Sequence, residues 1–230
     1  MPCPRPTVKR TFVPKTNGFS LLELLVVLLI LSVLIAIAIP ALRKSSDQAK
    51  GVRCMGNLRT IGTGLGKVVA DLGYYPGLRP VQHTAGKDRW YQLLQLYIDG
   101  VTAGSTDPIP KWLQCPSLDK PVSRNAESAN LQDLGYGYNK DGFGDTADRD
   151  YWQIRPAQVE LPSQKIVIGD NRDSGGYSTM LYGGAPLNQR ASRHNHGGYY
   201  LHADGHVQWW KDTELSEKLT TSRNSVWLPY

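Results

Sequence analysis

The sequence predicts an α+β fold in which one long N-terminal helix, transmembrane in its first half, packs on a small antiparallel sheet. Three observations support this prediction. The run from Leu24 to Leu42 carries no charge, and apolar residues then recur at helical spacing as far as Leu72. The C-terminal part holds β-rich runs separated by an Asp-Gly turn signal. A chain of 230 residues leaves enough length after the helix for one modest domain.

The net charge of +6 is concentrated at the N-terminus. Residues 1–18 contain four basic residues and no acid, so the high isoelectric point comes largely from this leader. Later in the chain no basic run with interleaved aromatic residues appears, as a nucleic-acid groove would need. The sequence therefore predicts no nucleic-acid partner.

The uncharged run has the length of a membrane span. At about 1.5 Å per residue it covers just under ~30 Å, the thickness of the hydrocarbon core. The basic leader before it places residues 1–18 in the cytoplasm and sends the C-terminal domain outward. A cleaved secretory signal peptide fits poorly, because the run is too long and no small-x-small site follows it. A plain signal anchor remains the alternative, but it leaves Glu23, at the edge of the run, unexplained.

The helical pattern continues beyond the span. An amphipathic stripe predicts a helix that ends by Gly73, and the stripe consists of Leu58, Ile61, Leu65, Val68 and Leu72. Four glycines weaken the helix propensity of this stretch: Gly56, Gly62, Gly64 and Gly66. They either permit close packing or mark an irregularity, and the sequence leaves both readings open.

The segment from Lys15 to Val27, with Gly18-Phe19 and Glu23 inside it, resembles the prepilin leader of type IV pilins and type II secretion pseudopilins. The resemblance implies a pilin-like fold and a prepilin peptidase that cuts between Gly18 and Phe19 and methylates Phe19. It also implies other pilin or pseudopilin subunits and an inner-membrane assembly machinery as partners. The chain would be a single-pass protein of the bacterial inner membrane, with its globular domain in the periplasm, before it enters a pilus or pseudopilus.

Within this reading Glu23 has an assembly role. Cutting leaves a free amine on Phe19 at the start of an apolar helix, where an amine and a carboxylate are each costly to bury alone. Pairing between neighbouring subunits would relieve both and set their stagger. The predicted organisation is a cleaved leader at 1–18, a transmembrane and assembly helix at 19–42, and an extracytoplasmic globular domain at 43–230.

Two cysteines outside the leader form a candidate pair. If Cys54 and Cys115 lie outside the cytoplasm, a disulfide is expected. The alternative is two unpaired buried thiols. Between and after them, the residues Trp90–Ile98 predict a short helix, and Tyr136–Asn139 predict a short strand or turn.

An acidic stretch suggests a calcium hypothesis. It contains Asp141, Asp145, Asp148 and Asp150 among flexible glycines, which could wrap a cation that prefers oxygen ligands. The spacing is not that of an EF-hand loop. The alternative is a solvated acidic loop in which Arg149 balances part of the charge.

The C-terminal region predicts a β-hairpin whose turn is Asp204-Gly205. His194 stands nine residues before Asp204, and this spacing resembles the His-nine-residues-Asp-Gly motif of many bacterial pilin-like proteins. Four of the five histidines lie between His194 and His206. They predict either structural hydrogen bonds at the hairpin or a transition-metal site.

The sequence contains no catalytic motif of specific spacing, so we expect a structural subunit and not an enzyme. The alternative is a minor or tip subunit, or a membrane-tethered protein, whose C-terminal domain binds a ligand or metal. Solvent exposure of Trp209, Trp210 and Trp227 distinguishes the two, since a contiguous exposed aromatic patch favours binding.

Overall fold

The computed structural model describes residues 20–77, 89–100, 110–118, 123–124, 131–132, 134–143, 154–171, 180–181 and 193–219. The chain divides into two compact units, Met1–Lys44 and Ser45–Tyr230. The long helix α1 (Leu21–Leu72) begins in the first unit and ends in the second.

In the first unit, α1 exposes its large apolar side chains from Leu21 to Leu42. Among the described residues, α1 is the helix that is long and apolar enough to cross a membrane by length and composition. Glu23 lies in its first turn, and Pro40 lies inside it.

In the second unit, one face of α1 enters the hydrophobic core. Its buried apolar side chains are Cys54, Leu58, Ile61, Leu65 and Val68, so the predicted stripe is confirmed, with Leu72 packed at its edge. The helix stops where the sequence predicts, because Gly73 takes a left-handed conformation with φ of 80° and its N–H bonds to the carbonyl of Val69.

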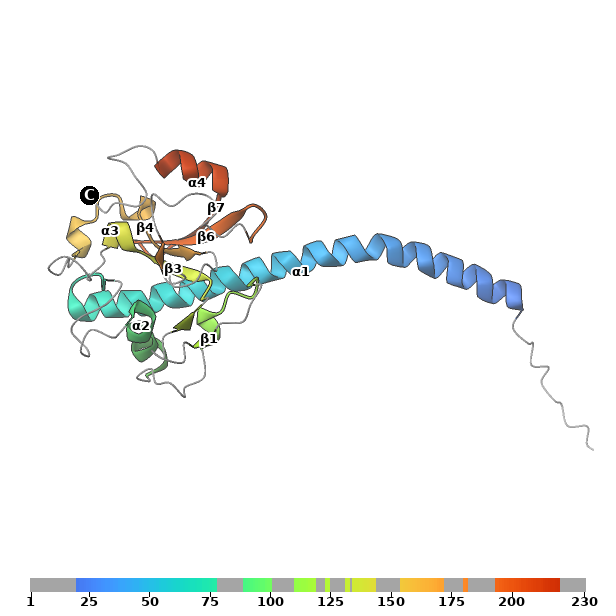
Figure 1. Cartoon of the computed structure of the whole chain (residues 1–230), viewed down its shortest axis with the longest axis horizontal. Helices are drawn as coiled ribbons and strands as arrows, with labels where there is room; N and C mark the ends of the chain where they lie inside the picture. Colours follow the sequence, from blue (N-terminus) through green and yellow to red (C-terminus); the bar gives the residue numbers. More distant parts are fainter. Residues whose placement is uncertain are drawn as a thin grey trace, which may run out of the picture. The chain divides into compact units, whose positions relative to one another are not determined.

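The sheet of the second unit has the strand order β5-β3-β4-β6-β7. Figure 1 labels four of these strands: β3, β4, β6 and β7. Four strands form a continuous antiparallel set: β3 (Tyr136–Asn139), β4 (Ile166–Asp170), β6 (Gly197–His202) and β7 (Val207–Lys211). The short β5 (Met180–Leu181) adds a parallel edge beside β3. A separate antiparallel pair joins β1 (Ser123–Arg124) and β2 (Leu131–Gln132). The predicted α+β class and small antiparallel sheet are confirmed, and the parallel edge strand is an addition.

Short helices complete the second unit. The helix predicted from Trp90 is confirmed as α2 (Trp90–Asp99), which Gly100 ends with a φ of 71°. The others are α3 (Lys140–Phe143), α4 (Asp212–Leu219), η1 (Lys111–Leu113), η2 (Pro156–Gln158) and η3 (Pro162–Gln164).

The predicted hairpin is present between β6 and β7. Gly205 has a φ of 91°, which glycine adopts without strain, and Asp204 precedes it in the turn. The register pairs Tyr199 with Trp209 and Leu201 with Val207.

The glycines of α1 show that the helix runs between two layers of the second unit. A Cβ on Gly62 would lie 2.8 Å from Leu201 of β6, and one on Gly64 would lie 2.5 Å from Ile98 of α2. Both glycines therefore permit close packing, one against the sheet and the other against α2. Figure 1 shows α1 running between α2 and the strands of the sheet. Gly56 and Gly66 would meet nothing within 4 Å, so two of the four glycines have no packing role of this kind.

This contrast gives a matched pair of variants. Gly62→Ala should lower the free energy of unfolding by about 1–2 kcal/mol, because overpacking against the fully buried Leu201 outweighs the gain in helix propensity. Gly66→Ala should raise it by about 0.5–1 kcal/mol, since only the propensity changes. Denaturant unfolding in detergent, followed by tryptophan fluorescence, measures both. Equal or greater stability of Gly62→Ala would contradict the close contact.

Candidate functional site

The N-terminal candidate residues lie at the start of α1. The Glu23 carboxylate accepts a hydrogen bond of 2.9 Å from the backbone N–H of Ser20. A negative charge is favoured here, because the first N–H groups of a helix lack partners and its N-terminal end is electropositive. Gly18 and Phe19 lie outside the described residues. Ser20 directly follows Phe19 in the sequence. The Glu23 carboxylate therefore bonds to the residue next to the one that the predicted cut would make the N-terminus.

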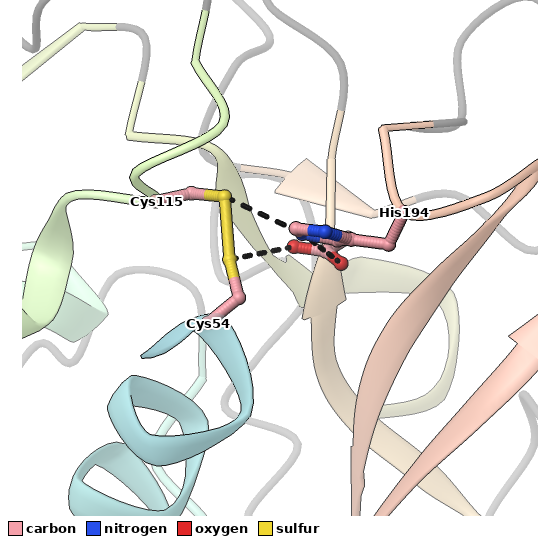
Figure 2. A group of neighbouring side chains, drawn as sticks. Cys54, Cys115 and His194 are labelled. Atoms are coloured by element: carbon pink, nitrogen blue, oxygen red, sulfur yellow. Dashed lines mark hydrogen bonds and ion pairs between the residues drawn. A yellow bond between two sulfur atoms is a disulfide. The ribbon is translucent and has the colours of Figure 1, made fainter. Parts of the chain in front are cut away.

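A second group of functional side chains lies inside the second unit. Cys54 on α1, Cys115 after η1, Asp170 at the end of β4 and His194 before β6 bring one ligand atom each to within 4.8 Å of one another. All four residues are buried. Figure 2 shows the two cysteines and His194 converging from separate segments of the chain. We call these four residues the Cys-Asp-His cluster.

The two cysteines of the cluster are placed as a disulfide (Figure 2). Their Cα atoms are 5.4 Å apart, a separation within the usual range for a disulfide. The Tyr136 hydroxyl lies 3.1 Å from Cys54 Sγ, and His194 Nε2 lies 3.6 Å from Cys115 Sγ. That the pair is oxidised in the protein stays a prediction.

Asp170 and His194 form the polar half of the cluster. His194 Nε2 lies 3.5 Å from Asp170 Oδ2, and Arg193 lies 3.7 Å from Oδ1. Burial raises the pKa of Asp170 to about 6, although Arg193 and the Tyr199 N–H act in the opposite direction. Burial, with help from Arg193, lowers the pKa of His194 to about 4. At neutral pH the cluster therefore holds a neutral imidazole beside an ionised carboxylate.

Hydrogen bonds fix the polar half in place. The Tyr199 N–H donates to Asp170 Oδ2 at 2.7 Å, and Arg193 donates to the carbonyls of Gly135 and Asn171, each at 2.8 Å. The indole N–H of Trp209 donates to the His194 carbonyl at 2.9 Å. His194 thus contacts the hairpin through its carbonyl and through its ring, which packs edge-on against Tyr199 with centroids 5.1 Å apart, while its Nε2 faces the cluster.

The other end of the predicted motif has a different partner. Asp204 Oδ1 accepts from the His206 N–H at 3.1 Å and lies 2.6 Å from His206 Nδ1. Partial burial raises the pKa of Asp204, but the contacts with His206 outweigh it and lower the pKa overall. The His202 and His206 rings stack with centroids 4.2 Å apart. Among the described residues, His194 is the histidine that joins a group with metal-ligand spacing, so the histidines do not form one site.

Most of the acidic stretch proposed to bind calcium lies outside the described residues. Asp145, Asp148 and Asp150 lie outside the described residues, and Asp141 is described only as part of the α3 backbone. The calcium hypothesis therefore stays a prediction. Trp227 also lies outside the described residues.

The two tryptophans of β7 are each partly covered by the rest of the domain. Trp209 and Trp210 are half-buried, and both indole N–H groups have partners within the domain, the His194 carbonyl and His202 Nε2. The two side chains therefore form no fully exposed aromatic pair.

One member of the cluster was not predicted as a site residue from the sequence. Asp170 follows a run of apolar residues, Ile166–Ile168, and is itself fully buried in β4. An acid at the end of a buried strand is expected to have a hydrogen-bond or ion-pair partner, because a buried charge is costly alone. The sequence does not show which residue is that partner.

Comparison with known proteins identifies the N-terminal region. Residues 14–39 match the family described as the prokaryotic N-terminal methylation motif. The chain carries a prepilin-type N-terminal motif. The match includes Gly18, Phe19, Glu23 and most of the apolar run. Comparisons with curated proteins and with solved structures found no match.

The motif supports a type IV pilin-like protein, and together with the apolar helix it is consistent with a membrane anchor. The motif implies processing by prepilin peptidase and assembly with other pilin subunits. It points to a structural subunit, not to an enzyme.

Proposed function

We propose that the chain is a pilin-like structural subunit that assembles through its apolar helix into a type II secretion pseudopilus or a type IV pilus-like fibre. The observation that carries this proposal is the methylation motif at residues 14–39, which overlaps a helix whose apolar side chains are exposed. A helix of this kind in a single chain lacks partners for its apolar surface. A membrane first, and neighbouring subunits later, would supply them.

The proposal assigns an order of events to the N-terminus. Prepilin peptidase cuts between Gly18 and Phe19 on the cytoplasmic side and methylates the Phe19 amine. The basic leader keeps residues 1–18 in the cytoplasm, and the globular domain lies in the periplasm. Because the cut precedes the apolar run, the mature chain keeps its membrane helix until assembly.

Glu23 supports the same proposal through its position. Its carboxylate already lies at the N-terminal end of α1, where it accepts the Ser20 N–H. In a fibre it would pair with the Phe19 amine of an adjacent subunit, which would neutralise two charges in an apolar surrounding. The inner-membrane assembly machinery would supply the subunits one after another.

Mass spectrometry of the N-terminal peptide tests the proposal directly. The chain is produced in a bacterium that contains prepilin peptidase and is purified from its membranes. The wild-type peptide should begin at Phe19 and carry one added methyl group, whereas Gly18→Leu should retain residues 1–18. Asn17→Ala, next to the cut, is the matched control and should be processed normally. A wild-type chain that begins at Met1, or beyond Pro40, would overturn the proposal.

A further inference from the structure

The Cys-Asp-His cluster has a ligand set that a disulfide does not need. A disulfide between Cys54 and Cys115 requires neither a carboxylate nor an imidazole, yet both lie buried close to the sulfur atoms. Burying such polar side chains costs free energy unless they gain partners. Two thiolates, one imidazole nitrogen and one carboxylate oxygen are donor types that Zn²⁺ binds in proteins.

From this arrangement we infer that the dithiol form of the chain binds one Zn²⁺ through Cys54, Cys115, Asp170 and His194. The oxidised form does not, because a sulfur in a disulfide has no thiolate to donate. The chain has this dithiol form when it leaves the ribosome, and the redox state of its compartment decides how long the form persists.

The distances within the cluster fit a tetrahedral site. Bonds of about 2.1 Å to nitrogen or oxygen and about 2.3 Å to sulfur separate neighbouring ligand atoms by roughly 3.4–3.8 Å. Here Cys54 Sγ lies 3.8 Å from Asp170 Oδ1, Cys115 Sγ lies 3.6 Å from His194 Nε2, and His194 Nε2 lies 3.5 Å from Asp170 Oδ2. The first two distances are edges of a tetrahedron that has Asp170 Oδ1 as its oxygen vertex, whereas the third involves the other carboxylate oxygen, Oδ2. One ligand atom from each residue already lies within 4.8 Å of the others, and loss of the bond between the two sulfur atoms allows them to separate.

A set of surrounding donors supports the ligands. The Tyr136 hydroxyl contacts Cys54 Sγ and receives a hydrogen bond of 3.1 Å from Asn57 Nδ2, which leaves its own proton free for the sulfur. The Tyr199 N–H donates to Asp170 Oδ2, the oxygen opposite the one nearest Cys54. Partners of this kind orient metal ligands and are common around protein zinc sites.

The charges of the site also balance. Two thiolates and the Asp170 carboxylate carry three negative charges, and Zn²⁺ with the nearby Arg193 guanidinium carries three positive charges. A buried site with no net charge avoids most of the penalty for an uncompensated charge. Without a metal, the Asp170 carboxylate would depend on the Arg193 guanidinium for charge compensation. Among the described residues, Arg193 is the permanently charged cation at ion-pair distance from it.

Cobalt binding to the full chain in detergent tests the inference. The chain is reduced with a non-thiol reductant and titrated with Co²⁺, a spectroscopic substitute for Zn²⁺. One equivalent should produce a thiolate-to-cobalt charge-transfer band and the strong visible bands of tetrahedral Co²⁺, and one equivalent of Zn²⁺ should abolish them. The oxidised chain should show neither. A reduced wild-type chain without these bands overturns the inference, whatever the variants do.

Variants then assign the ligands. Cys115→Ser, His194→Gln and Asp170→Asn should each weaken Zn²⁺ binding by roughly tenfold to a hundredfold or more, measured against a chromophoric chelator. Cys3→Ser removes the cysteine of the leader and is the matched control, which should bind as the wild type does. Tryptophan fluorescence checks that each variant is folded. Unchanged affinity in both His194→Gln and Asp170→Asn would reject the four-ligand site.

Discussion

Replacing Cys54 and Cys115 together by alanine should lower the free energy of unfolding of the globular unit by about 4 kcal/mol. The two residues are 61 positions apart in the sequence, and a disulfide that closes a loop of this size restricts the unfolded chain by about that amount. Reduction of the wild-type chain with an excess of thiol should have a similar effect. A chelator must be present, because metal bound to the reduced cluster would restore part of the stability.

Denaturant unfolding followed by tryptophan fluorescence measures this change. All six tryptophans lie after Lys44, so the signal reports the globular unit and not the apolar helix. Cys3→Ala is the control, since it removes a thiol from the leader and should change stability by less than about 0.5 kcal/mol. If the double variant and the reduced wild type both lose less than about 1 kcal/mol, the two cysteines are not a stabilising disulfide.

Replacing Glu23 by alanine should lower the amount of assembled fibre by at least about a hundredfold. In the proposed assembly the Phe19 amine of one subunit pairs with Glu23 of the next. Removing one partner of a buried ion pair costs about 3–5 kcal/mol, and each 1.4 kcal/mol is a factor of ten in an equilibrium constant. The cleaved, methylated monomer should still accumulate in the membrane, because the peptidase acts before assembly.

Ser32→Ala is a matched control for this experiment. Ser32 also lies on α1, and its hydroxyl donates to the carbonyl of Leu29 within the same helix, at 2.7 Å. Fibres sheared from cells are quantified by immunoblot and viewed by electron microscopy, with the membrane fraction as the measure of unassembled subunit. Wild-type fibre levels from Glu23→Ala would contradict the pairing role.

The local features of this protein were predictable from its sequence because their signals are local. The apolar run, the amphipathic stripe that ends at Gly73 and the Asp204-Gly205 turn each depend on residues a few positions apart. The methylation motif is also a short continuous segment, and an independent comparison recovers it. Each of these predictions needed no knowledge of how distant parts of the chain meet.

The Cys-Asp-His cluster could not be predicted in the same way. Asp170 is 116 positions from Cys54, and only the register between β4 and β6 places it beside His194. From the sequence, His194 was expected either to form hydrogen bonds at the hairpin or to join the other histidines in a transition-metal site. A bend of the chain at Asn195 and His196, which have φ values of 56° and 59°, precedes β6, while the His194 side chain reaches Asp170. Likewise, only the packing of α1 shows which glycines face a neighbour.

The position of α1 between the sheet and α2 has a mechanical consequence. In a fibre, tension that passes along this helix would reach the globular unit through Gly62 against β6 and Gly64 against α2. The load would be shared as shear across two faces, so the helix could not be peeled from one layer at a time. In the proposed fibre, the two glycines that let the layers approach would therefore also lie where the load enters the globular unit.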